Sequence, residues 1–199
     1  MSRTKLLMTA ASLILLITYV VPVWSIALDA PQYPEGLGLE IWLHTIDGAN
    51  PHDLNKINNL NHYIGMKVIE PDAIAELVYM PWIVGFMIVL GLAAAWKDDP
   101  RLVRAWVILF LLIAVAGLAD FWWWAYDYGH NLDTENAIIK VPGMTYQPPL
   151  IGSKQLLNFR AISLPHIGGI VIGVSILMGM ATAWLHRKRG AAVKTEALQ

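Results

Sequence analysis

His62 and Met66 are the residues whose types and spacing are best suited to chemistry. They lie four residues apart in the stretch NNLNHYIGMK, residues 58–67, which separates two strongly apolar regions. Imidazole and thioether together suit copper, above all Cu(I), better than zinc, magnesium or calcium. The asparagines of the stretch could supply hydrogen bonds that orient the imidazole. Because one histidine and one methionine do not hold a metal well, the stretch indicates half of a copper site.

The other half of such a site must come from elsewhere in the chain. Met144 is the first choice because it lies in a glycine–proline turn, and His130 and His166 come next. None of the six histidines lies inside an apolar run, which argues against a haem held between membrane helices. The alternative interpretation is that Met66 fills a hydrophobic core and His62 only forms hydrogen bonds.

Asp120 is the only carboxylate inside the third apolar run. An ionisable residue at membrane depth is costly and usually has a partner or a role. Asp127 lies on the same helix face, seven residues later, and Arg160 or His166 could reach that level. A structural pair that locks two helices together is favoured slightly over metal or proton chemistry.

Other chemistry is not indicated. The chain has no cysteine, which excludes disulfides, thiolate metal sites and covalent haem attachment. It contains no H-E-x-x-H or G-x-S-x-G motif, and Ser163 reads as a helix cap rather than a nucleophile. A net charge of −1 without a basic stripe indicates no nucleic-acid partner. The sequence predicts an accessory or metal-handling protein, not an enzyme.

Four long apolar runs must position these residues. The chain is 56% hydrophobic and 15% charged, whereas a soluble domain carries roughly 25% charged residues. Each run is long enough to cross a lipid bilayer as a helix, the only open-chain structure that satisfies the backbone there. The first run starts like a signal peptide, but its length favours an uncleaved anchor. We expect an all-α membrane protein with four transmembrane helices, at residues 6–26, 77–96, 105–126 and 167–185.

Basic residues predict the orientation. Nine of the 14 lysines and arginines lie in the short segments 1–5, 97–104 and 186–199, and five lie in the long segments 27–76 and 127–166. The positive-inside rule therefore places both termini in the cytoplasm. The two long loops would face the periplasm from a multi-pass protein of the bacterial inner membrane.

The two loops are expected to form an ordered cap. Alternation over residues 39–43 fits a short strand, and a helix starting near residue 51 should end at Gly65. Pro148-Pro149 and the neighbouring glycines should give the second loop a fixed shape. We expect the loops to pack on each other and to bury Tyr33, Tyr63, Tyr146 and Phe159.

The stretches APQYPEGL, LNHYIGMK and MTYQPPLIGSKQLLNFRA resemble the signatures of a family of small bacterial membrane proteins associated with the maturation of respiratory copper enzymes of the nitrous-oxide reductase type. The resemblance extends over both loops and their flanking runs, and it carries over no ligand set. It implies a membrane-anchored accessory protein that binds or delivers copper to such an enzyme. The alternative is a non-metal scaffold or accessory subunit of a larger membrane respiratory complex. A quinol- or proton-handling subunit that uses Asp120 ranks third.

Overall fold

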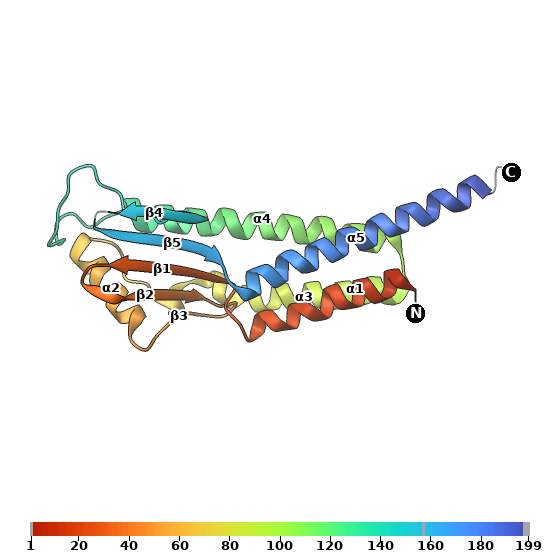
Figure 1. Cartoon of the computed structure of the whole chain (residues 1–199), viewed down its shortest axis with the longest axis horizontal. Coiled ribbons are helices and arrows are strands. Elements are labelled where there is room, and N and C mark those ends of the chain that lie inside the picture. The colour runs from red at the N-terminus through yellow and green to blue at the C-terminus, as the bar shows by residue number, and fades with distance from the viewer. Residues whose placement is uncertain (1, 157, 197–199) are drawn as a thin grey trace.

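The molecule is elongated, with a β-sheet at one end and a bundle of helices at the other (Figure 1). The computed structural model describes residues 2–156 and 158–196, with side chains described up to Arg189. Both ends of the chain lie at the end of the bundle farthest from the sheet. We call these two parts the sheet domain and the bundle.

Four helical segments form the bundle: α1 (Arg3–Ile14) continued by the 3₁₀ turn η1 (Leu15–Tyr19), α3 (Ala75–Lys97), α4 (Pro100–His130) and α5 (Ile167–Glu196). In the described part of the chain, α3, α4 and α5 are the helices long and apolar enough to cross a membrane. Local chemistry sets the turn between α3 and α4. Asp98 is left-handed at φ 53° and ends α3, while the Asp99 side chain accepts from the Arg101 N–H. Pro100 follows at the first helical position, where proline is well tolerated.

Small residues let the bundle helices approach closely around Trp106. This indole is fully buried, and its Nε1 donates to the Met87 carbonyl at 2.7 Å. Gly91 of α3 and Gly179 of α5 lie directly against Trp106, where a side chain would clash. Ser175 Oγ donates to the Ala11 carbonyl at 2.6 Å and so joins α5 to α1. Close packing and interhelical hydrogen bonds of this kind hold membrane helices together.

The sheet has five antiparallel strands in the order β3-β2-β1-β5-β4. Its centre is the pairing of β1 with β5, whose register runs from Trp24 opposite Pro165 to Asp29 opposite Arg160. The two strands join parts of the chain that lie on either side of α3 and α4. The strands are β1 (Trp24–Ala30), β2 (Tyr33–Ile41), β3 (Ile46–Gly48), β4 (Gly152–Leu156) and β5 (Phe159–Pro165).

One face of the sheet is covered by helices and the other is open. Buried Ile26, Leu37 and Leu39 of the covered face pack with α2 (Asp53–Ile64) and with Phe121, Trp124 and Tyr128 of α4. α4 has 31 residues and is about 46 Å long, whereas ~20 residues are enough to cross a bilayer. Its last turns therefore lie under the sheet, where the Trp24 and Phe121 rings are 5.5 Å apart.

Asp53 attaches the start of α2 to the sheet. Its buried carboxylate accepts from the Gly38 N–H at 3.0 Å, and from the Asn50 backbone N–H at 3.2 Å and side-chain amide at 3.0 Å. Burial raises the pKa of Asp53, but the hydrogen bonds from Gly38 and Asn50 outweigh burial and hold the pKa below its ordinary value.

The expected all-α fold with four transmembrane helices is wrong, because the chain contains a five-stranded sheet and its first apolar run is not one helix. Within residues 6–26, the α-helix ends at Ile14, the 3₁₀ turn ends at Tyr19, and residues from Trp24 onward belong to β1. Pro22 lacks the N–H that a continuing helix requires. The short strand expected at 39–43 is the end of a longer strand, β2, that stops at Ile41.

Candidate functional site

Two of the three asparagines of NNLNHYIGMK, Asn58 and Asn61, form hydrogen bonds with the backbone. Asn58 forms two hydrogen bonds with Ile69: its Nδ2 donates to the carbonyl at 3.1 Å, and its Oδ1 accepts from the N–H at 2.8 Å. Asn61 Nδ2 donates to the Lys67 carbonyl at 3.3 Å. These side chains hold the chain that turns back along α2. They orient this returning segment and not the His62 imidazole.

The two long loops meet at the end of α2. Gly65 ends the helix in the left-handed region at φ 78°, as expected from its sequence position. Its carbonyl accepts from the Asp133 N–H at 2.7 Å, and the Tyr63 carbonyl accepts from the Ile139 N–H at 2.9 Å. A β-carbon at Gly65 would lie 2.6 Å from the Asp133 carbonyl oxygen. Of the tyrosines expected to be buried, Tyr146 is buried, whereas Tyr63 is 47% exposed.

The five residues expected to bind copper lie on different elements and in different surroundings. His62 is exposed on α2, and Met66 borders an apolar cavity of about 70 Å³ between the sheet and the helices. His130 stacks on Tyr126 with ring centres 4.0 Å apart, at the end of α4. Met144 is half-buried in the second loop, and His166 joins β5 to α5. Among the described residues, no group of three or more His, Cys, Asp or Glu side chains could hold a metal ion.

Asp120, Asp127 and Arg160 do not meet. Asp127 forms an ion pair with Lys67 at 2.6 Å, so it joins α4 to the segment after α2. The Arg160 guanidinium donates to Ser153 Oγ at 2.9 Å across β4 and β5. Asp120 is exposed on α4, and among the described residues it forms neither an ion pair nor a hydrogen bond. The structure therefore places the three side chains at three separate positions.

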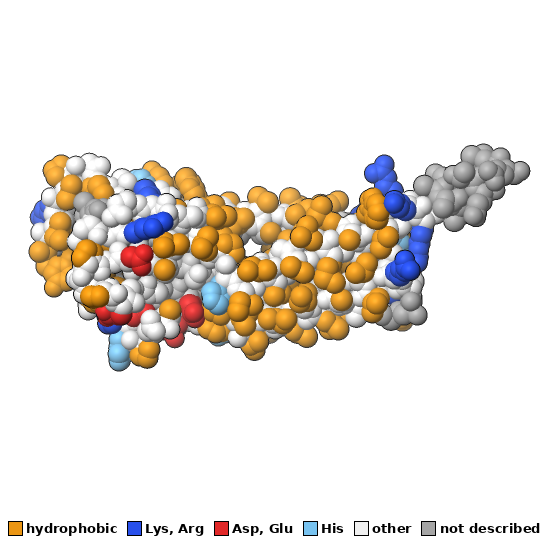
Figure 2. Space-filling model, in the orientation of Figure 1, with side chains coloured by type: hydrophobic (Ala, Val, Ile, Leu, Met, Phe, Trp, Pro, Cys, Tyr) orange, Lys and Arg blue, Asp and Glu red, His pale blue; other side chains and the backbone are white. Residues whose placement is uncertain are grey.

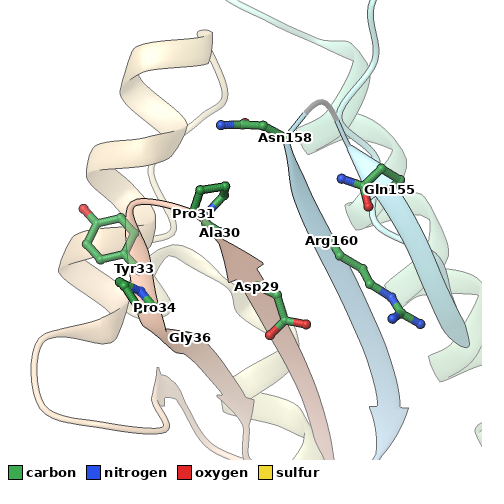
Figure 3. A pocket seen from close by; sticks show the side chains of 9 residues that line it. All are labelled: Asp29, Ala30, Pro31, Tyr33, Pro34, Gly36, Gln155, Asn158 and Arg160. Carbon is green, nitrogen blue, oxygen red and sulfur yellow. The ribbon is translucent and has the colours of Figure 1, made fainter.

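A polar pocket lies where the β1–β2 and β4–β5 hairpins end (Figure 3). This end of the sheet is the one farthest from the bundle (Figure 1). Its volume is about 390 Å³, and it is open to solvent. The residues that line it are Asp29, Ala30, Pro31, Tyr33, Pro34, Gly36, Gln155, Asn158 and Arg160.

Strand pairing places the charged groups of this pocket. Asp29 and Arg160 are direct partners in the β1–β5 register, so their side chains project from the same face of the sheet. Gly36, at φ 74°, lies next to the Asp29 carboxylate: a β-carbon there would be in van der Waals contact with Oδ1, at 3.8 Å. A carboxylate, a guanidinium and carboxamides can bind a ligand that carries both donors and acceptors. The pocket is therefore a candidate binding site.

From the sequence, Arg160 was expected to be able to reach the level of Asp120. The residue opposite Arg160 is Asp29, about 130 positions earlier in the chain, at the edge of the stretch APQYPEGL. An acidic and a basic residue in two separate hairpins give no local signal of their pairing. The proline- and glycine-rich sequence around residues 31–36 was a signal for the hairpin turn itself.

Fold and site together define a class of protein: apolar helices suited to a membrane that carry an antiparallel sheet domain with a polar pocket at its far tip. In comparisons with known proteins, no family model matches the chain, and no curated protein sequence matches it.

Proposed function

We propose that this protein is an accessory subunit of a larger membrane assembly and that its sheet domain holds a partner protein at a fixed height above the membrane. The observation that carries this proposal is the direct connection between sheet and bundle. β5 ends at Pro165 and α5 begins at Ile167, while the end of α4 packs under the sheet. A rigid domain on a membrane anchor suits a scaffold.

The distribution of charge supports the orientation in this proposal. Lysine and arginine side chains gather at the end of the bundle away from the sheet (Figure 2). At that end Lys5 Nζ donates to the Trp96 carbonyl at 3.0 Å. Lys97 ends α3, and Arg101 and Arg104 lie in the first turns of α4. Under the positive-inside rule this end faces the cytoplasm, and the sheet domain faces the periplasm of a bacterial inner membrane.

The open tip of the sheet is the proposed contact with the partner. Its pocket combines Asp29 and Arg160 with the carboxamides of Gln155 and Asn158. Such a pocket recognises a polar, charged segment of a protein chain through hydrogen bonds to both donors and acceptors. The opposite face of the sheet is already covered by α2 and α4.

The contacts of NNLNHYIGMK support a packing role more than a copper site. Asn58 and Asn61 already bind the backbone, and the Met66 side chain borders an apolar cavity while His62 is exposed. The stretch therefore supports a packing role. For this reason we favour the scaffold form of the accessory function over copper delivery.

Purification from host membranes in a mild detergent tests the proposal. We expect one reproducible partner at a fixed ratio, no equimolar copper after Cu(I) loading, and loss of the partner in Arg160→Glu. Lys154→Glu is the matched control, because Lys154 is an exposed cation of the neighbouring strand that does not line the pocket. A monomer that binds one equivalent of copper would contradict the scaffold role and support copper handling.

A further inference from the structure

One face of α4 packs on the bundle as far as Ala114 and on the sheet domain from Phe121 onward, and between them it is open at Gly117. Trp106 and Phe110 of this face are buried in the bundle core, and Phe121 contacts the sheet domain. Gly117 lies between them on the same face of the helix, yet a β-carbon at Gly117 would find nothing within 4 Å. Gly173 on α5 also has open space around it. Figure 1 shows α4 and α5 diverging toward the sheet.

Asp120 lies one turn beyond Gly117 and is exposed. Asp120 follows Arg104 by 16 residues, which is about 24 Å along the helix. A bilayer core is about 30 Å thick, so a helix with Arg104 at the cytoplasmic edge of the core holds Asp120 inside it. A carboxylate that faces lipid within this core is costly and needs a partner. Glu76 at the start of α3 adds a second negative charge close enough to act on Asp120, so the neighbouring helix does not supply that partner.

We propose that this open face of α4 receives a transmembrane helix of a different protein, which carries a lysine or arginine at the depth of Asp120. The proposal rests on the accessory role and names the chemistry of a partner within the membrane. Gly117 has no side chain, which allows a second helix to approach closely at this position. The basic residue neutralises the carboxylate and provides its hydrogen-bond donors.

The composition of the chain excludes a second copy as the source of this charge. Residues 68–96, 105–139 and 161–186 contain no lysine or arginine. Lys67, the basic residue closest in sequence to the start of α3, is already paired with Asp127. A lipid acyl chain is a poor occupant because it carries no hydrogen-bond donor.

Designed helices in lipid vesicles provide the test. Because the chain has no cysteine, Lys97→Cys takes a donor dye in the full-length protein, reconstituted in phosphatidylcholine vesicles. The probes are two acceptor-labelled, leucine-rich transmembrane peptides. One carries a lysine about 6 Å inside one end of its apolar segment, and the other has leucine at that position. We expect the lysine peptide to bind about tenfold more tightly, since interhelical polar contacts reach about 1–2 kcal/mol in model peptides and about 1.4 kcal/mol is tenfold.

Two variants on α4 decide the origin of this preference. Asp120→Asn should reduce the affinity ratio of the two peptides to about one, whereas Asp127→Asn, the same change nearer the end of the helix, should retain it. Equal binding of both peptides to the wild type, as expected if lipid fills the face, would overturn the proposal. Energy transfer between two copies of the protein would assign the face to a second copy if Asp120→Asn abolishes that transfer. This result would also overturn the proposal. In either case a native complex that still depends on Arg160 would leave the accessory role standing.

Discussion

Replacing Asn58 by alanine should release the chain segment that turns back along α2. The Asn58 side chain binds both the N–H and the carbonyl of Ile69, at 2.8 and 3.1 Å. The Ile69 side chain is itself buried, with 5% exposed. Alanine leaves both backbone groups of Ile69 without this partner at a part-buried position.

The expected loss follows from the two hydrogen bonds. A typical hydrogen bond contributes about 1 kcal/mol, and a buried group left without a partner costs about 1–3 kcal/mol. We therefore expect local opening of residues 66–70 to become easier by about 2 kcal/mol, which is about thirtyfold in the opening equilibrium. Asn58→Asp keeps the acceptor for the Ile69 N–H and loses the donor, so its effect should be intermediate.

Amide hydrogen exchange followed by mass spectrometry measures this opening directly. In the detergent-purified protein, peptides covering residues 66–70 should exchange about thirtyfold faster in Asn58→Ala, while peptides of the bundle should not change. Asn59→Ala is the matched control, because Asn59 is exposed on the same helix. Unchanged exchange in Asn58→Ala, or an equal increase in Asn59→Ala, would refute the assignment of Asn58 as the residue that holds this segment.

Three other predictions concern the sheet domain and its attachment. The folded pKa of Asp53 is lowered, so its contribution to stability is present above its unfolded pKa and is lost as pH falls through the lower folded pKa. In Asp53→Asn, the unfolding midpoint should therefore fall less steeply as the pH is lowered than it does in the wild type. Lys67→Ala should change the free energy of unfolding by less than about 1 kcal/mol, because Lys67 and Asp127 are 46% and 39% exposed; a larger shift in a thermal melt would contradict this. Gly65→Ala should destabilise more than Gly143→Ala in the same melt. Both glycines have φ above 70°, but only Gly65 has backbone atoms where the new side chain would lie; equal losses would show that backbone strain alone matters.

Local sequence was enough to predict the three long helices, but not where α4 and α5 end. Each of α3, α4 and α5 satisfies its backbone within one apolar segment, and α-helical hydrogen bonds join residues only four positions apart. The same locality made the end of α2 predictable: Gly65 adopts the left-handed conformation that a helix C-terminus favours. The start of α2 was less accurate, since the helix begins at Asp53 after a left-handed His52 and not at residue 51.

The sheet and the roles of the polar residues depend on contacts between distant parts of the chain. The apolar residues at 24–26 continue the hydropathy of the first run, and their assignment to a strand depends on β5, which begins at Phe159. The same long-range pairing brings Asp29 opposite Arg160, and the turn after α2 brings Ile69 to Asn58. Strand hydrogen bonds connect residues at any separation along the chain, so a local pattern can indicate an extended segment but cannot name its partner. Helices could therefore be read from the sequence, while the sheet and the pocket that it builds required the fold.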